Sequence, residues 1–149
     1  MNKINRRKKS DTKIVDSKKD KILSSNAEKF IKDSKFGASI YFLGTVRNIN
    51  DNKAVIGITY DSHDEMVIKS FEEIYNETDQ KLDIKEKAVF IEHAKGHLKL
   101  GEISIIIAVA CKHRDQAYVL SRYIIEDIKK RSPIWKKEQR LDGEHWVSR

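Results

Sequence analysis

The chain has 149 residues, of which 39% are hydrophobic and 36% charged, and its formal net charge is +7. This length suits one compact domain with a hydrophobic core, and a count of six glycines and one proline argues against a fibrous or disordered chain. The single cysteine, Cys111, excludes an internal disulfide and an all-cysteine zinc site. It favours a reducing compartment, so we predict a cytoplasmic protein.

Positive charge is concentrated at the N-terminus. Residues 1–21 contain nine Lys or Arg and three Asp, which leaves the other 128 residues almost neutral. Because this segment lacks an apolar h-region, it is typical of neither a secretory signal nor a membrane span. We predict that residues 1–20 form a flexible basic extension and that residues 21–149 form a single domain.

The first half of the chain is predicted to contain two helices and two strands. Segment 25–32 indicates a short helix, and the apolar run 38–46 indicates a buried strand. Turn residues follow, so we expect segment 54–60 to pair with the preceding strand as a hairpin with a longer loop. In segment 64–82 apolar residues recur every three or four positions, which predicts a helix lying on a sheet.

The second half is predicted to add two strands, a long helix and a C-terminal pair of strands. Segments 87–92 and 102–111 indicate strands, and the second is apolar on both faces, as in a sheet covered on both sides. A helix is expected at 115–131, followed by short strands at 134–140 and 144–147. These elements predict an α+β domain whose mixed, mostly antiparallel sheet carries helices packed on it.

Common catalytic motifs are absent from the chain. It has no Walker loop, no G-x-G-x-x-G after a strand, no G-x-S-x-G elbow and no H-E-x-x-H. His93 and His97 are four residues apart, but Gly96 and a pattern of strand followed by loop argue against a helical metal pair. Cys111 ends an apolar run, which favours a small buried residue over a nucleophile. We therefore predict neither a metal nor a cofactor.

The most informative segment is 129–140, KKRSPIWKKEQR, in which six cations and one carboxylate surround the only proline. Pro133 cannot continue a helix and favours extended backbone in the residue before it, so Lys129 and Lys136 flank a rigid bend. Two amines in this arrangement could converge on one phosphate. The alternative is a solvated charged face, but Ile134 and Trp135 interrupt the charge with apolar surface, which suggests packing against a core.

Four segments, in this order and spacing, resemble the catalytic large subunit of molybdopterin synthase. They are GASIYFLGTVRN at 37–48, HAKGHLKLGE at 93–102, CKHR at 111–114 and KKRSPIWKKE at 129–138. The resemblance extends over about residues 12–147. It departs from the family at Ala94, where an arginine is frequent, and at Lys112, where a small residue is common.

This resemblance implies an α/β hammerhead fold and a homodimer with a ubiquitin-like small subunit docked at each end. The implied reaction transfers sulfur from the C-terminal Gly-Gly thiocarboxylate of the small subunit to cyclic pyranopterin monophosphate, forming the dithiolene of molybdopterin. Both reactants are anions, so fixed positive charge in the site would offset their repulsion and stabilise a developing oxyanion.

The resemblance also implies roles for individual residues. Lys129 and Lys136 match the catalytic lysines, and four residues match substrate-binding positions: Arg47, His113, Arg114 and Phe42. Of these, the His-Arg pair is expected to reach the pocket across the dimer, while Trp135 and Glu138 are expected to be structural. Local alternatives stay open, because Arg47 could close a hairpin ion pair and the His-Arg pair could cap the last helix.

A competing hypothesis is a nucleic-acid-binding module that uses the basic N-terminal extension together with segment 129–140. The sequence contains no helix-turn-helix, RNP aromatic pair, KH loop or zinc finger, and the charge outside the extension is close to zero. We therefore consider a nucleic-acid partner unlikely on sequence grounds. An inactive scaffold is disfavoured because both lysines are present.

Overall fold

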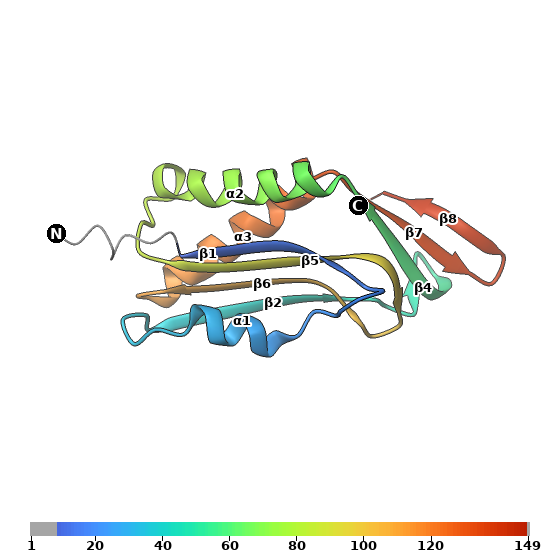
Figure 1. The fold of residues 1–149 in the computed structure, drawn as a ribbon, viewed down its shortest axis with the longest axis horizontal. Coiled ribbons are helices and arrows are strands. Elements are labelled where there is room, and N and C mark those ends of the chain that lie inside the picture. The colour runs from blue at the N-terminus through green and yellow to red at the C-terminus, as the bar shows by residue number, and fades with distance from the viewer. Residues whose placement is uncertain (1–8, 149) are drawn as a thin grey trace.

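The computed structural model describes residues 9–148, which form one eight-stranded sheet with helices on both faces (Figure 1). The helices are α1 (Ser24–Ile31), α2 (Asp64–Lys81) and α3 (Arg114–Arg131). The strands are β1 (Ser10–Asp16), β2 (Ala38–Thr45), β3 (Ile49–Asn50), β4 (Lys53–Ser62), β5 (Ala88–Lys99), β6 (Ile103–Cys111), β7 (Ile134–Arg140) and β8 (Gly143–Val147). Among the described residues, no helix combines the length and the apolar character that crossing a membrane would require.

The predicted fold class is confirmed. The main path of the sheet runs β2-β6-β5-β4-β7-β8, and every pairing along it is antiparallel. The one parallel pairing joins β1 to β5. The domain is therefore α+β, with a mixed and mostly antiparallel sheet.

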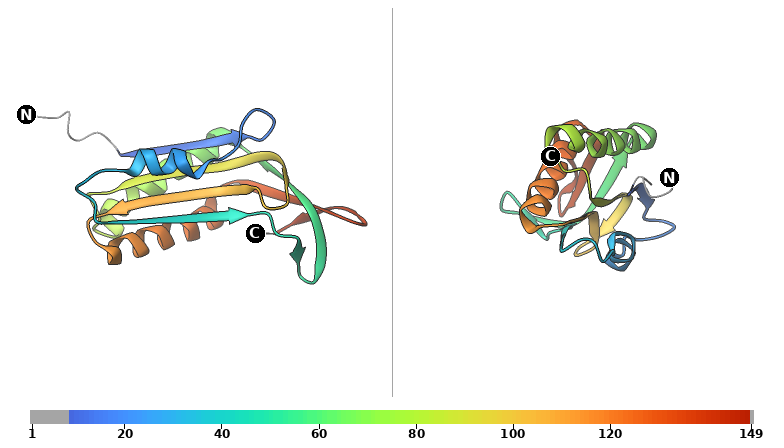
Figure 2. Two further views of the ribbon diagram at one scale, coloured as in Figure 1. Left: turned by 90° about the horizontal axis from the view of Figure 1, so that it is seen from below. Right: turned by 90° about the vertical axis from the view of Figure 1, so that its left-hand side faces the viewer.

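Helices cover the two faces of the sheet unequally. Figure 2 shows α2 and α3 side by side on one face and the shorter α1 on the other. The apolar stripe predicted for α2 is buried in the larger core, where Val67, Phe71 and Ile74 are inaccessible to solvent. Strand β6 contributes alternate residues to the cores on both faces, which confirms the prediction of a sheet covered on both sides.

Strand β5 is longer than the segment 87–92 predicted for it, because it continues to Lys99 through Gly96. It changes its neighbour along its length: residues 89–95 pair with β1, and residues 96–99 pair with β4. Gly96 stands at the change with a φ of +93°, and a Cβ there would collide with the hydroxyl of Ser17. Glycine is thus required where the sheet passes from its main part to the β4-β7-β8 part.

The predicted hairpin between segments 38–46 and 54–60 is wrong. Strand β2 pairs with β6, whereas β4 pairs with β5 and β7. The tight hairpin lies instead between β3 and β4, where Asp51 and Asn52 both have positive φ angles, 49° and 63°. Asp and Asn tolerate this left-handed conformation, so the local turn signal is real but closes a much shorter strand than expected.

The prediction that segment 38–46 is buried is also wrong for the single chain. Strand β2 lies at the edge of the sheet, and three consecutive large side chains are exposed: Tyr41 by 41%, Phe42 by 37% and Leu43 by 42%. An apolar composition predicted burial, but burial depends on a covering element that the described residues do not supply on this edge.

The boundary predicted for the N-terminal extension needs correction. Residues 10–16 belong to the sheet as β1, with Ser10 opposite Val89 and Asp16 opposite Lys95. Ile14 packs against one core and Val15 against the other. The polar residues on either side of these two hid this strand in a charged segment. The part of the predicted extension at residues 1–8 lies outside the described residues.

Strand β1 is expected to contribute measurably to stability. Deleting residues 1–16 should lower the melting temperature by about 10 °C or more relative to a chain lacking residues 1–8, since it removes the burial of Ile14 and Val15 at about 1.5–3 kcal/mol each. Thermal unfolding followed by circular dichroism measures the difference. Equal melting temperatures for the two truncations would contradict the role of β1.

Candidate active site

The bend predicted at Pro133 is held by hydrogen bonds on both sides. Helix α3 ends at Arg131, and Ser132 is extended with φ −80° and ψ 128°, as expected before a proline. The Ser132 hydroxyl lies 2.7 Å from the Ser70 hydroxyl of α2, and the Ser70 hydroxyl also contacts the carbonyl of Val67. The carbonyl of Pro133 accepts a hydrogen bond from the amide of His63. The backbone that separates Lys129 from Lys136 is therefore fixed against α2.

A second contact anchors the end of α3. Arg131 donates two hydrogen bonds to the Glu77 carboxylate of α2, at 2.8 and 2.7 Å, and also contacts Asp127. The paired guanidinium lowers the pKa of Glu77 to about 2. A bidentate pair of this kind fixes direction as well as distance, so it sets the position of the last turn of α3 against α2.

Beside this bend lies a cavity of about 320 Å³. A row of side chains crosses the sheet and forms its floor, because Gly44 of β2 lies opposite Ile105 of β6, Ile105 lies opposite His93 of β5, and Tyr60 of β4 lies opposite Lys136 of β7. His93 and Tyr60 meet edge to face, with ring centroids 5.0 Å apart. Helix α3 supplies the facing wall through Ile125, Ile128 and Lys129.

Four of the six predicted site residues line this cavity: Lys129, Lys136, Arg47 and Phe42. Phe42 and Arg47 come from β2 and the segment directly after it, whereas Lys129 and Lys136 come from α3 and β7, more than 80 residues further along the chain. Within residues 9–148, Arg47 makes no hydrogen bond or ion pair, so the alternative of a hairpin ion pair finds no support. The cavity thus gathers three cationic side chains and one aromatic wall.

His113 and Arg114 do not join this cavity in the same chain. They stand at the start of α3, sixteen and fifteen residues before Lys129, which corresponds to about 24 Å along the helix. Both are exposed. His113 is the N-cap residue, but its side chain makes no capping hydrogen bond, so the capping alternative is not supported either.

His93 and Tyr60 line the cavity and were not selected from the sequence. His93 is 5% exposed, and its Nδ1 lies 2.7 Å from the carbonyl oxygen of Ala94. The available signal was strand alternation: His93 follows Val89 and Ile91 at a spacing of two, which places it on the same buried face. Gly96 suggested that a loop began here and masked this signal.

Glu138 is a structural residue, as expected, and it connects two parts of the site. Its carboxylate is 1% exposed and accepts hydrogen bonds from Arg140 at 2.9 and 2.8 Å and from Asn50 at 2.6 Å. Asn50 belongs to β3, which closely follows Arg47, and Glu138 lies two residues after Lys136. The buried carboxylate therefore ties the segment bearing Arg47 to the strand bearing Lys136.

The cations of segment 129–140 do not form one continuous basic surface. Three of them are engaged with carboxylates: Arg131 with Glu77, Lys137 with Glu144 and Arg140 with Glu138. Lys129 and Lys136 line the cavity. Only Lys130 is left as a solvated cation among the six, so this segment does not favour a nucleic-acid partner.

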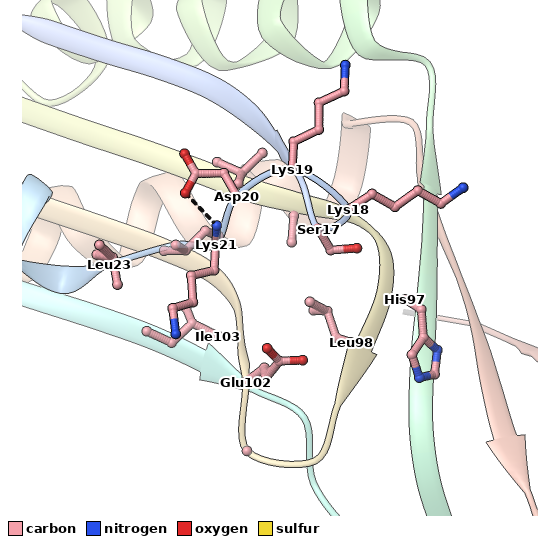
Figure 3. A pocket seen from close by; sticks show the side chains of 14 residues that line it. Ser17, Lys18, Lys19, Asp20, Lys21, Leu23, His97, Leu98, Glu102 and Ile103 are labelled. Atoms are coloured by element: carbon pink, nitrogen blue, oxygen red, sulfur yellow. Dashed lines mark hydrogen bonds between the residues drawn. The ribbon is translucent and has the colours of Figure 1, made fainter.

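A larger cavity, of about 590 Å³, lies on the opposite face of the sheet and contains none of the predicted site residues. It is bounded by loop 17–23 and by the end of β5. In Figure 3 the side chains of Lys18 and Lys19 point away from it, while Lys21 and Glu102 reach over it from different sides. Size alone therefore does not identify the site, because the larger cavity is lined by charges of both signs, whereas the charged side chains that line the smaller one are all basic.

Cys111 lies at the end of β6 and is fully buried, as predicted. Burial raises the pKa of its thiol to about 11, so the sulfur stays protonated at neutral pH. Cys111 does not line the cavity described above. A nucleophilic role for this cysteine is therefore not supported.

Comparison with known proteins gives a consistent family. The family model described as "MoaE protein" matches residues 17–131. The molybdopterin synthase catalytic subunit of Pyrococcus abyssi is 36% identical over 117 residues, which is 78% of each chain. The crystal structure of molybdopterin synthase from Staphylococcus aureus superposes with a TM-score of 0.83 at 31% identity, covering 92% of this chain and 96% of that one. A chain from the complex of subunits 1 and 2 of molybdopterin-converting factor of Helicobacter pylori shares the fold, with a TM-score of 0.71 at 24% identity over 91% and 89% of the two chains.

The Glu77–Arg131 pair predicts a pH-dependent contribution to stability. Because the pKa of Glu77 is lower in the folded chain, its stabilisation is present above the ordinary carboxylate value of 4.5 and is lost as the pH falls toward about 2. Near pH 7, Glu77→Gln should lower the free energy of unfolding by about 1 kcal/mol after solvent screening, and the difference should shrink through the acidic range and vanish below about pH 2.

Urea unfolding at several pH values measures this effect. Glu73→Gln is the matched control, because Glu73 is exposed on the same helix and has no ion-pair partner within residues 9–148. A constant difference between Glu77→Gln and the wild type across the acidic range would contradict the proposed contact.

Proposed function

Because the chain belongs to the MoaE family of molybdopterin synthase catalytic subunits, which act in molybdenum cofactor biosynthesis, we propose a specific sulfur transfer for it. The sulfur donor is the C-terminal thiocarboxylate of a ubiquitin-like small subunit. The acceptor is cyclic pyranopterin monophosphate, and the product is the dithiolene of molybdopterin.

One observation carries this proposal: Lys129, Lys136 and Arg47 line a single cavity. The two reactants are a phosphate ester and a thiocarboxylate, which repel each other in a partly desolvated site. Fixed cations offset this repulsion and stabilise negative charge that develops during acyl transfer. The volume of about 320 Å³ suits a small ligand together with the end of a peptide.

The positions of the cations suggest a division of labour. Arg47 follows β2, and its planar guanidinium suits bidentate binding of the phosphate. Lys129, on α3, is exposed at the open side of the cavity, which suits acyl or proton chemistry at the incoming thiocarboxylate. Lys136 rises from the floor beside Tyr60 and would bind substrate and stabilise charge. Phe42 forms an apolar wall.

A homodimer would complete the site. Strand β2 has a free edge and exposes Tyr41, Phe42 and Leu43, and the neighbouring face of α3 exposes Tyr118 and Val119. Such a contiguous apolar edge is typical of an interface between subunits. This surface supports a two-fold contact along β2.

The two-fold contact would also account for His113 and Arg114. In the sheet, Ala38 at the start of β2 lies opposite Cys111, close to His113, and Thr45 at the end of β2 lines the cavity. A two-fold axis through the middle of β2 exchanges the two ends of the strand. It would therefore bring the His113–Arg114 end of one protomer to the cavity of its partner.

Reconstitution with a thiocarboxylated small subunit and the cyclic pterin tests the proposed reaction. Lys129→Ala and Lys136→Ala should each lower the rate of dithiolene formation by about 100-fold or more, because each removes a cation from the reaction site. Lys130→Ala is the control, since this adjacent residue points to solvent, and it should keep the wild-type rate. Absence of product with the wild type and its cognate carrier would overturn the proposal.

Mixed dimers test whether the site is shared between protomers. Lys129→Ala and Arg114→Ala homodimers should each be nearly inactive, but a mixed dimer retains one site with both residues intact. Exchange of equal amounts should restore about a quarter of the wild-type rate, because half the dimers are mixed and each has one working site. The control is a mixture of Lys129→Ala and Lys136→Ala. Both residues line the cavity of the same chain, so each site of a mixed dimer lacks one lysine and activity should not be restored.

A further inference from the structure

We propose that His93 is the general base that allows water to release the sulfurated product from the small subunit. This inference rests on the proposed function and adds a residue to it. It concerns a step in which a base must take a proton from water, which the guanidinium of Arg47 cannot do and which is distinct from the roles proposed for the two lysines.

The chemistry requires such a step. When the sulfur of a thiocarboxylate forms a bond to a pterin side-chain carbon, a carbon–oxygen bond at that carbon breaks and the oxygen leaves with the electron pair. The sulfur remains bonded to the carbonyl carbon of the carrier, so the two molecules are joined as a thioester. Water must then form a bond to that carbonyl carbon while one of its protons passes to a base. The carbon–sulfur bond breaks, the electron pair leaves with the sulfur as a pterin thiolate, and the carrier ends in a carboxylic acid that ionises.

His93 lies where this base is needed. It stands on β5 in the middle of the cavity floor, opposite Ile105 of β6 and in contact with the ring of Tyr60. Its backbone belongs to a central strand that is hydrogen-bonded on both sides, so the ring is carried on a rigid element. Lys129 faces the same cavity from α3 and Lys136 from β7, and both are suited to stabilise the oxyanion that water addition creates.

The hydrogen bond of His93 selects its tautomer. Nδ1 lies 2.7 Å from the carbonyl oxygen of Ala94, and a carbonyl oxygen can only accept, so Nδ1 carries the proton. In the neutral ring Nε2 is then the basic nitrogen. Tyr60, packed edge to face at 5.0 Å, limits rotation of the ring. A neutral imidazole of fixed tautomer has the form that a general base requires.

The other polar groups of the cavity are less suited to take a proton from water. Arg47 is a donor only, Lys129 and Lys136 are assigned to the thiocarboxylate and to charge stabilisation, and Ser104 donates its hydroxyl proton to the carbonyl of Gly44. Of the described residues that line the cavity, His93 is the one that carries an imidazole, in which one ring nitrogen can donate a hydrogen bond while the other accepts.

A single-turnover experiment separates this role from a structural one. The full-length wild type and His93→Gln are each mixed with thiocarboxylated small subunit and cyclic pterin, quenched at intervals, and analysed by intact-mass spectrometry of the carrier. With His93→Gln, the carrier–pterin thioester should form at the wild-type rate and then decay at least about 100-fold more slowly. Glutamine keeps an N–H that can donate to the carbonyl of Ala94, so the floor of the cavity is preserved.

Controls define the outcomes. The control is His97→Gln. His97 lies four residues after His93 on β5, its Nδ1 is near the Thr59 hydroxyl, and it does not line the cavity. The rates of thioester formation and of thioester decay should therefore both match the wild type. Wild-type decay of the thioester in His93→Gln, or equal slowing of its formation and its decay, would overturn the role of His93. Absence of both adduct and product with the wild type would instead count against the proposed function itself.

The pH dependence of decay in the wild-type enzyme, together with rescue of the variant, provides a second test. The decay rate of the thioester should rise with pH through the range in which a histidine loses its proton, and added imidazole should accelerate decay in His93→Gln. A decay rate that is independent of pH across that range would overturn the proposal.

Discussion

The electrostatic constraint on this structure is that three basic side chains, Lys129, Lys136 and Arg47, line one cavity. Like charges near a protein surface repel, so these side chains can share a cavity only where their backbone segments are held in place. Each is carried on a segment that is fixed elsewhere. The end of α3 is bound to α2 through Glu77 and Ser70, and Glu138 joins β7 to β3. The cavity lined by these three cations is therefore held in shape by contacts that lie outside it.

In the dimer that we propose, a second copy of the chain would complete the site. The cavity is lined in part by β2, the edge strand that carries exposed aromatic and aliphatic side chains, and His113 and Arg114 stand at the far end of α3. Catalytic competence and association would be coupled in this dimer, because the surface that excludes water from the site would also join the two protomers. Loss of the dimer would then reduce turnover without altering any residue of the cavity.

The sequence allowed α2, α3, β7 and β8 to be predicted within one or two residues, because their signals are local: apolar spacing of three to four, alternation and a proline. It did not allow the partners of β2 and β4 to be predicted, since pairing depends on segments distant in the chain. Strand β1 was missed because only Ile14 and Val15 mark it within a charged segment. The residues of the cavity followed mostly from resemblance to a family. The sequence analysis considered His93 only as a possible metal ligand. It did not predict that His93 lines the cavity, because Gly96 suggested that a loop begins there.

Strand β5 belongs to both parts of the sheet, and Gly96 is the point at which it passes from one to the other. Lys129 stands over the main part, whereas Lys136 is carried by the β4-β7-β8 part. The angle between the two parts of the sheet therefore sets the distance between the side-chain amines of Lys129 and Lys136. Ser17 packs against Gly96, so a larger residue at either position would change the angle between the two parts of the sheet. The distance between the two lysines would then change, although neither position contributes a charge to the cavity.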